Sequence, residues 1–535
     1  MPIERWEPRI ETTKQEDMLL CRMTRVRKLL RFLRRHRHEL FDSSFQDELA
    51  SMYRETGAGK APIWPAMMAM VCLVQGYLGA SDATMVELTV VDLHVQMVLD
   101  RLGAEEPAFS QGALCDFRAR LIKTDMDRRL LERTVELARK SKEFDWHKLP
   151  KSLRVAIDSK PLEGAGRVED TFNLLGHAAR KLVACAAQLI GWPEEKVCRE
   201  AGIPLLLAPS IKQGLDIDWN DAQEKAEAIK TLATQLDSLQ GWLCNRLPEQ
   251  LAQPPLQEHI QTLAQLRKQD LEPDPNGGGV KIREGVAEDR RVSIEDAEMR
   301  HGRKSKSKLF NGYKQHIAAD IDGDLILACT VTPANRPEAE AAPALAADIE
   351  RQGLQIGELY IDRGYINSQV VDDVLSRRGE IVCKPWDSKN KGLFPKSAFK
   401  LDMRARTITC PGEQTKHFEL GSIVEFDSEI CDRCPLRAKC TTAELGSGRT
   451  VSISEDERLQ QRLRKQLRAP VGRARLRKRA GIEHRLAHIS RRQGPRARYI
   501  GARKNTFDLR RAATIQNLET LHRRTEPPAQ RKVAK

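Results

Sequence analysis

Three acidic residues have surroundings that suit metal-dependent chemistry. Asp158 in RVAIDSK and Asp362 in LYIDRGY each end a short apolar run, and Glu483 lies far downstream in a basic stretch. A carboxylate at the end of a strand is held by a rigid element and faces solvent, where a metal ion can reach it. Two Mg²⁺ ions about 3.5–4 Å apart can activate both the attacking and the leaving oxygen of a phosphodiester. Because Mg²⁺ prefers oxygen ligands and needs few carboxylates, we predict that these acids hold two such ions.

Other acids near these segments have simpler explanations. Asp170 can cap the helix that begins after it. Asp320 and Asp324 flank a turn, where we expect them to be solvated, and Glu358 lies at the start of the strand before Asp362. A calcium loop that starts at Asp320 is excluded, because an EF-hand needs Glu at its twelfth position, where Val331 stands.

The elements that must position the three acids are predicted to form an α/β core, a mixed sheet with flanking helices. Short apolar runs predict strands at residues 153–158, 312–335, 358–362 and 380–386. The second of these is a hairpin, which turns at Asp322-Gly323. Helices are expected over 337–352, 368–377 and 454–488.

Changes in hydrophobic period divide the chain into two predicted domains. Residues 1–145 form a helical N-terminal domain, which fits a DNA-binding module and an ordinary helical bundle equally well. Residues 150–535 form the catalytic domain, with a helical insertion at about 175–290, a cysteine-rich insertion at about 385–450 and a basic tail at 520–535. Within the helical insertion, apolar residues at a 3-4-3-4 spacing predict a hairpin of two helices.

Four of the twelve cysteines are clustered, namely Cys410, Cys431, Cys434 and Cys440. A Cys-x-x-Cys pair with two further cysteines nearby is typical of a tetrahedral Zn²⁺ site. Their spacing is irregular, so the sequence leaves two alternatives open, a structural Zn²⁺ ion or a set of reduced, buried thiols. Trp386, near the start of this insertion, could stack on an unpaired base or belong to the core.

The net charge of +14 is concentrated near the C-terminus. Residues 461–535 hold 23 Lys or Arg and 4 Asp or Glu, a net charge of +19, so the first 460 residues carry −5. This asymmetry favours a nucleic-acid partner, although a solubilising basic tail would also produce part of it. Nine Lys or Arg lie in 462–481, Arg477 and Lys478 among them. We expect these residues, and the basic residues of 491–518, to face DNA phosphates.

The composition favours an intracellular protein. No segment has the roughly 18 consecutive apolar residues that span a bilayer, and the first residues, MPIERWEPRI, lack an apolar signal core. We therefore expect a cytoplasmic bacterial protein that associates with the nucleoid, with most of its cysteines reduced.

An ordered set of motifs resembles the DDE insertion-sequence transposases. Asp158 with the following SKPLEGAGRVEDTFNLL is similar to their first acidic motif, and RHGRKSKSKLFNGYKQHIAAD (300–320) to the strand region after it. DRGY (362–365) resembles the second acidic motif, and Arg479-x-x-x-Glu483 resembles the Arg-Glu part of the third. Residues 40–125 resemble the helical N-terminal domain of these transposases, so the resemblance extends over residues 40–520.

Two positions depart from the third motif of the family. Leu476 stands where many members have Tyr, and Ser490 stands where a basic residue is usual, with Arg491 beside it. The resemblance gives that basic residue a phosphate contact, and Arg491 is our candidate for this role. All three acids are present.

The resemblance implies a ribonuclease-H-like fold that cuts double-stranded DNA at terminal inverted repeats and joins the 3′-hydroxyl to target DNA. It implies two Mg²⁺ or Mn²⁺ ions on the three acids, and a homodimer, because two ends must be cut together. Arg479 would orient Glu483 or hold a phosphate, since residues four apart share a helix face. The alternatives are a catalytically silent DNA-binding derivative and a zinc-dependent DNA-binding regulator.

Overall fold

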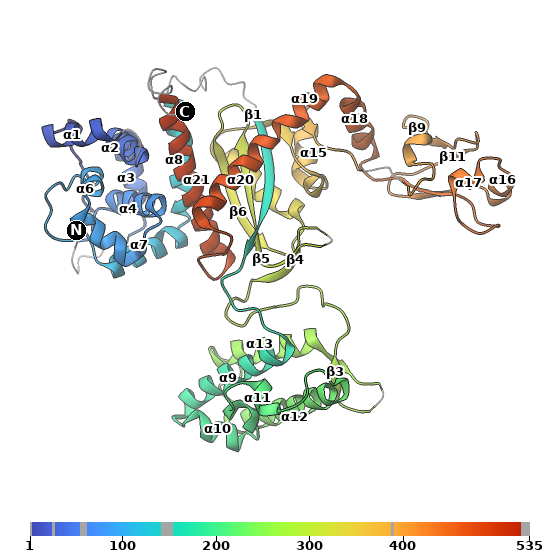
Figure 1. Ribbon diagram of the computed structural model, residues 1–535, viewed down its shortest axis with the longest axis horizontal. Helices are drawn as coiled ribbons and strands as arrows, with labels where there is room; N and C mark the ends of the chain where they lie inside the picture. The colour runs from blue at the N-terminus through green and yellow to red at the C-terminus, as the bar shows by residue number, and fades with distance from the viewer. Residues whose placement is uncertain are drawn as a thin grey trace.

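The computed structural model of the 535-residue chain describes residues 3–23, 27–53, 61–140, 153–275, 277–305, 307–386 and 390–525. Figure 1 shows a sheet at the centre of the molecule, with the N-terminal helices on one side of it. A separate helical lobe lies below the sheet, and an arm with small strands and short helices extends on the other side.

The central sheet has six strands. They are β1 (Leu153–Glu163), β4 (Arg300–Arg303), β5 (Leu309–Asp320), β6 (Ile326–Pro333), β7 (Ile356–Tyr360) and β8 (Glu380–Val382). β5 pairs antiparallel with β1 on one side, and with β4 and then β6 on the other. β7 and β8 continue the sheet beyond β1 in parallel. The prediction of a mixed sheet in an α/β core is confirmed.

β1 is longer than predicted, so the expectation that Asp158 ends a strand was wrong. The strand continues because β5 pairs with it from Val155 to Glu163, with Asp158 opposite Ile317. Its other neighbour, β7, stops earlier, and the last pair joins Ala156 to Tyr360. Asp158 therefore lies on a stretch of β1 that β7 no longer covers.

Two helices after β6 flank the sheet. A 3₁₀ turn (Glu338–Ala341) leads into α14 (Ala342–Arg351), which packs on β6. α15 (Gln369–Ser376) packs on β7 and β8, and its apolar residues Val370, Val371 and Val374 are buried.

The single long helix predicted over 454–488 is wrong, because the chain breaks there into three helices. They are α18 (Glu457–Arg468), α19 (Pro470–Lys478) and α20 (Ala480–Gln493). Pro470 has no backbone N–H to continue α18, and Ala469 before it is extended, as the residue before a proline prefers. The second break lets α20 follow its own direction and pack along β1.

The N-terminal region is built from eight helices among its described residues. They are α1 (Lys14–Arg22), α2 (Lys28–Leu40), α3 (Ser43–Ala50), α4 (Pro65–Leu78), α5 (Asp82–Val91), α6 (Leu93–Val98), α7 (Gln111–Lys123) and α8 (Met126–Lys140). Ser81 and Ser110 cap α5 and α7, as predicted. α4 is apolar and almost wholly buried, as expected of a central helix. Among the described helices, none combines the length and apolar character that a bilayer-spanning segment requires.

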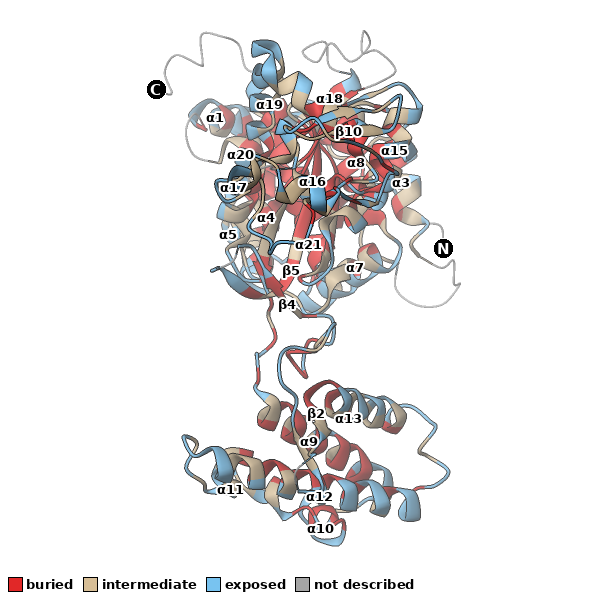
Figure 2. Cartoon of the chain, turned by 90° about the vertical axis from the view of Figure 1, so that its right-hand side faces the viewer, coloured by how far each residue is buried: buried red, intermediate tan, exposed pale blue. Residues whose placement is uncertain are grey.

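The helical lobe has a core of its own, separate from the sheet. Its helices are α9 (Thr171–Ile190), α10 (Glu194–Glu200), α11 (Ile211–Leu215), α12 (Ala222–Arg246) and α13 (Leu256–Asp270), and β2 (Leu271–Pro273) pairs with β3 (Val280–Ile282). Figure 2 shows its buried interior and the extended segments that join it to the sheet. α13 packs chiefly against α9 rather than α12, because α9 contributes a long buried apolar face. The predicted two-helix hairpin is therefore a three-helix arrangement.

The arm contains the clustered cysteines. It consists of β9 (Lys400–Asp402), β10 (Thr407–Thr409), β11 (Thr415–His417), β12 (Ile423–Glu425), α16 (Ser428–Asp432), α17 (Arg437–Cys440) and β13 (Thr450–Ser452). A small apolar cluster with Phe399, Phe418 and Phe426 lies at its centre. Strands of three residues and so small a core suggest that the arm gains much of its stability from other interactions.

The last helix, α21 (Ala502–Thr525), packs between the N-terminal helices and the sheet. Asn517 donates to and accepts from the backbone of Ile326 on β6, at 2.8 Å each, and donates to Thr134 of α8. Arg510 forms ion pairs with Asp127 and Asp348 at 3.2 and 3.4 Å. The expectation that the basic residues of 491–518 all face DNA is therefore wrong for Arg510 and Arg511, which are buried. Sequence charge alone does not reveal the acidic partners that allow an arginine to be buried.

Arg510→Ala is expected to lower the free energy of unfolding by about 1–3 kcal/mol, because it removes the buried cation shared by Asp127 and Asp348, although Arg503 and Arg351 still pair with them. Chemical denaturation monitored by circular dichroism measures this change. Arg377→Ala is the control, since Arg377 forms an exposed ion pair with Glu350 and its loss should change stability little. Equal losses in the two variants would contradict a structural role for the buried network.

Candidate active site

The parallel pairing of β1 with β7 brings the two predicted aspartates together. Ala156 is paired with Tyr360, and Asp158 and Asp362 each follow two residues later. Positions that follow a parallel pair by the same number of residues lie at the same level of the sheet. Asp362 caps a short 3₁₀ turn, and its carboxylate accepts the backbone N–H of Gly364 at 2.9 Å.

Asp158 is buried, with only 8% of its surface exposed. Burial raises the pKa of its carboxyl to about 6, and the negative charges of Asp362 and Glu483 raise this pKa further, whereas Arg479 opposes the change. The three acids therefore lie close enough to influence one another. The chain brings them together from β1, the turn after β7, and α20.

Arg479 links two of these acids. It is the residue before α20, and its guanidinium lies 3.2 Å from a carboxylate oxygen of Asp158 and 2.9 Å from one of Glu483. The helical spacing of four residues predicts the second contact, but only the tertiary structure places Asp158 beside them. Arg479 thus neutralises part of the negative charge of the site.

A fourth carboxylate, that of Glu338, lies beside Asp362. Glu338 accepts a hydrogen bond from the hydroxyl of Ser159, the residue after Asp158. It also lies against Gly364, where a Cβ atom would come within 2.0 Å of its carboxylate. Burial raises the pKa of Asp362, and the charge of Glu338 raises it further. Sequence reasoning missed Glu338 because it lies in no acidic motif, although it begins the helical turn that follows the hairpin.

Hydrogen bonds among buried side chains hold the turn that carries Asp362. The hydroxyl of Tyr365 lies 2.7 Å from Nδ1 of His316, and Nε2 of His316 lies 2.9 Å from the Thr332 hydroxyl. Burial lowers the pKa of His316 to about 3, so this histidine is neutral at physiological pH. A neutral ring can donate from one nitrogen and accept at the other, which fixes the turn that carries Asp362.

A lysine of β1 lies beside Ser490, the position where the family pattern has a basic residue. Ser490, which stands at the position of the usual basic residue, contacts the ammonium of Lys160. Lys160 follows Asp158 by two residues, so it lies on the same face of β1. Burial lowers its pKa, and so do the charges of Lys304 and Lys308. The chain therefore supplies a cation from β1 at the position of Ser490.

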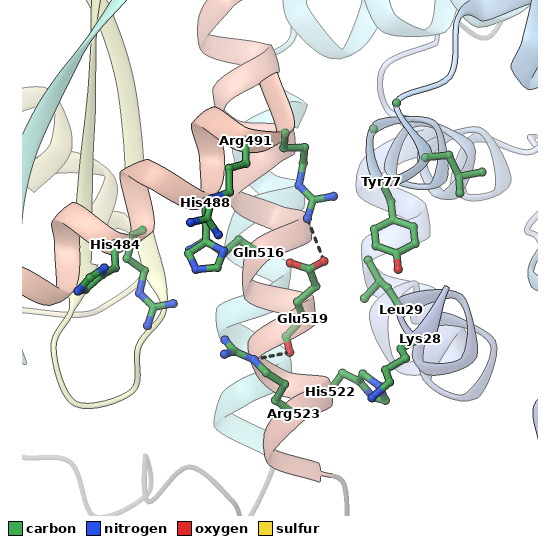
Figure 3. Close-up of a pocket in the computed structure, with 15 residues that line it drawn as sticks. Lys28, Leu29, Tyr77, His484, His488, Arg491, Gln516, Glu519, His522 and Arg523 are labelled. Atoms are coloured by element: carbon green, nitrogen blue, oxygen red, sulfur yellow. Dashed lines mark hydrogen bonds and ion pairs between the residues drawn. The ribbon is translucent and has the colours of Figure 1, made fainter. Parts of the chain in front are cut away.

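The residues predicted to bind DNA lie at three separate places. Arg477 and Lys478 are exposed at the end of α19. Trp386 is 42% exposed, before the arm, with the Arg363 guanidinium 5.9 Å from its ring. Arg491 lines a groove between α20, α21 and the N-terminal helices, shown in Figure 3.

The remaining acids differ in part from expectation. Asp170 caps α9, as predicted, Glu358 pairs with Arg475 at 3.0 Å, and Asp324 pairs with Arg485. Asp320 is buried rather than solvated, and burial raises its pKa to about 6. The turn folds over its side chain, which accepts the backbone N–H of Gly323.

The four clustered cysteines line one small cavity of the arm. The Sγ atoms of Cys410 and Cys434 both border Gly412. Burial raises the pKa of the Cys440 thiol, and its proximity to the other three cysteines raises this pKa further. All four are free cysteines of intermediate exposure, so they are not the fully buried thiols of the second sequence alternative.

Among the residues that the structure describes, no group of three or more His, Cys, Asp or Glu side chains is arranged to hold a metal ion. At the acids, the guanidinium of Arg479 stands between Asp158 and Glu483. The donor chemistry still fits a divalent cation, because carboxylate oxygens are the ligands that Mg²⁺ prefers. The pKa of Asp158 is raised chiefly by burial and to a smaller extent by the charges of Asp362 and Glu483, and a bound cation would stabilise its ionised form.

Comparisons with known proteins identify two matching families. The family described as Transposase DDE domain matches residues 405–522, and the family described as Transposase domain (DUF772) matches residues 23–120. The first match includes Glu483 but begins after Asp158 and Asp362, so these two aspartates rest on the fold geometry. No curated protein and no solved structure matches the chain significantly.

Asp158→Asn is expected to gain stability relative to the wild-type protein as the pH rises. The folded-state pKa of Asp158 is about 6, above the ordinary value of about 3.9 for an aspartate, so ionisation between pH 4 and 6 destabilises the folded wild type. The variant does not ionise, and its relative free energy of unfolding should increase by up to about 3 kcal/mol over this window. Denaturation in chelator at pH 4 and pH 7 measures the difference.

Asp402→Asn is the matched control with the opposite sign. The backbone N–H groups of Ala405 and Arg404 lower the pKa of Asp402, so its ionised form stabilises the fold and the variant should lose relative stability as the pH rises. Equal pH dependence in the two variants would contradict the assignment of Asp158 to a crowded acidic site.

Proposed function

We propose that this chain, a DDE-type insertion-sequence transposase by its two family matches, cuts double-stranded DNA at terminal inverted repeats and joins the ends to target DNA. The observation that carries the proposal is the convergence of Asp158, Asp362 and Glu483 around Arg479. Hydrolysis of one phosphodiester leaves a 3′-hydroxyl, which then attacks a phosphorus of the target strand and displaces its 3′ oxygen.

The sheet supports a ribonuclease-H-like assignment of the catalytic fold. β6, β5 and β1 are antiparallel neighbours in that order, β4 pairs with the start of β5, and β7 and β8 are added in parallel beside β1. The first acid lies on the central strand and the second follows its parallel neighbour. This is the arrangement that the family resemblance implies.

Asp158, Asp362 and Glu483 would hold two Mg²⁺ or Mn²⁺ ions. When bound, these ions would supply the charge stabilisation that phosphodiester cleavage needs. Asp158 has a pKa of about 6, so it is largely ionised at neutral pH and able to act as a ligand. Arg479 and a divalent cation compete for the same carboxylate oxygens, so occupation of the acids frees Arg479 to hold a phosphate.

Glu338 would position the second acid of this site. Its negative charge raises the pKa of Asp362, and its contacts with Ser159 and Gly364 tie together the two segments that carry the aspartates. A carboxylate in this place can also accept a hydrogen bond from a water molecule at the metal ions.

The partners that follow from this function are DNA and a second copy of the chain. Arg477, Lys478, Arg491 and Trp386 are the proposed contacts with DNA, because they are exposed or line the basic groove. A homodimer would bring two element ends together for cutting. The cysteines of the arm would hold a structural Zn²⁺ ion, which would stabilise a segment with little core of its own.

Asp158→Asn, Asp362→Asn and Glu483→Gln should each lower Mg²⁺-dependent cleavage of terminal-repeat DNA by about 10²–10³-fold or more. Each substitution removes a charged ligand but keeps the size of the side chain. Glu338→Gln should reduce the rate less, because it acts through Asp362. Gel assays with labelled repeat-ended duplexes measure cleavage and strand transfer.

Asp372→Asn is the control, since Asp372 is an exposed aspartate on α15. If the wild-type protein binds repeat-ended DNA but never cuts it with Mg²⁺ or Mn²⁺, the chain is a catalytically silent DNA-binding derivative and the enzyme proposal fails.

Purified protein is expected to contain one Zn²⁺ per chain, and Cys431→Ser should lose it, because a tetrahedral site needs all four thiolates. Elemental analysis by mass spectrometry measures the zinc, and Cys244→Ser, an exposed cysteine of the lobe, serves as the control. Zinc-free wild-type protein would identify the four residues as reduced thiols. Zinc without any metal-dependent cleavage would favour a zinc-dependent DNA-binding regulator.

A further inference from the structure

A groove with a volume of about 780 Å³ lies between the N-terminal helices on one side and α20 and α21 on the other. Figure 3 shows α20 and α21 on one side of this groove, and Lys28, Leu29 and Tyr77 from α2 and α4 on the other. At Gly76, which lines the groove, α4 packs closely on α21, since a Cβ atom there would lie 2.9 Å from Ile515. The groove is distinct from the site of the three acids.

Helix α20 contributes residues both to the site of the three acids and to the groove. On α20, His484, His488 and Arg491 follow one another at spacings of four and three residues, so they share one face of the helix, and all three line the groove. Glu483, the residue before His484, points instead toward Arg479 and Asp158. The groove therefore includes the residue next to Glu483 in the chain, His484, and Figure 3 shows Lys28 across the groove from α20 and α21.

The charge of the groove is strongly positive. Its described lining has five Lys or Arg and a single acid, Glu519. Glu519 is already paired with Arg492 at 2.9 Å, and Arg492 is further held over the ring of Tyr77. Arg485 is paired with Asp324.

Three cations of the lining, Lys28, Arg491 and Arg523, form no ion pair with any carboxylate in the described parts of the chain. Arg523 donates only to the Glu519 backbone carbonyl and the Thr520 hydroxyl. Burial lowers the pKa of His488, and the charges of Arg491, Arg485 and Arg523 lower it further. These arginines therefore concentrate positive charge around one point of the groove.

We propose that this groove binds the phosphate backbone of the DNA segment that flanks the cut, and so joins the N-terminal helices and the catalytic region to one duplex. The proposal rests on the proposed function, since it names where that DNA lies. A backbone of repeated phosphates can contact cations at both ends of the groove, whereas a small anion would neutralise only one cluster. Phosphate contacts position DNA without reading its sequence, so any duplex should bind here.

The test measures binding of a random-sequence blunt duplex by fluorescence anisotropy over a series of NaCl concentrations. Lys28→Ala, Arg491→Ala and Arg523→Ala should each weaken binding about three- to tenfold and lower the slope of log affinity against log salt by about 0.9, the value for one lost phosphate contact. Arg491→Lys, which keeps the charge, should retain the wild-type slope. Thermal unfolding of each variant verifies that it folds.

Arg199→Ala is the matched control, because Arg199 is an exposed helical arginine of the lobe, outside the groove. Wild-type affinity and slope in all three groove variants, or an equal loss in Arg199→Ala, would overturn the proposal. The readout does not depend on cleavage, so it separates failure of the groove proposal from failure of the proposed function. The binding assay therefore tests the groove even if the protein does not cut DNA.

Discussion

Buried ion pairs and hydrogen bonds of α21 hold the N-terminal helices against the sheet, and the relative placement of the other elements depends on them. Arg510 connects Asp127 of α8 with Asp348 of α14, and Asn517 occupies the backbone groups of Ile326 on β6. An exposed edge strand invites pairing with another chain, so this cover also protects the sheet. Because α20 precedes α21 and packs along β1, the same anchor sets where the third acid lies.

The carboxylates of the candidate site repel one another, and Arg479 neutralises only part of their negative charge. The register of β1 with β7 brings Asp158 and Asp362 to one level of the sheet, and burial raises the pKa of both. Glu338 and Glu483 add further negative charge, and the guanidinium of Arg479 opposes it. Conflicts of this kind are characteristic of functional sites, where a bound cation or phosphate completes the charge balance.

Local signals predicted most helix caps, whereas the errors came from one long-range strand pairing and from two local features, a turn and a proline. Ser81, Ser110 and Asp170 cap their helices as predicted, because a cap depends on the next few residues alone. Asp158 lies within its strand because β5, distant in sequence, extends the pairing. Asp320 is buried by the fold of its own turn. The proline at position 470 was a visible signal, and it should have divided the helix predicted there.

The sequence by itself determined the α/β class, the three acids in their order, the cysteine cluster and the basic C-terminal region, since all of these are patterns of neighbouring residues. The tertiary structure alone decided which charges meet. It buried Arg510 in an ion-pair network, placed Glu338 beside Asp362 and gathered Lys28 with Arg491 across a groove. These contacts join residues that are far apart along the chain, and their energies depend on burial and distance, which residue spacing does not specify.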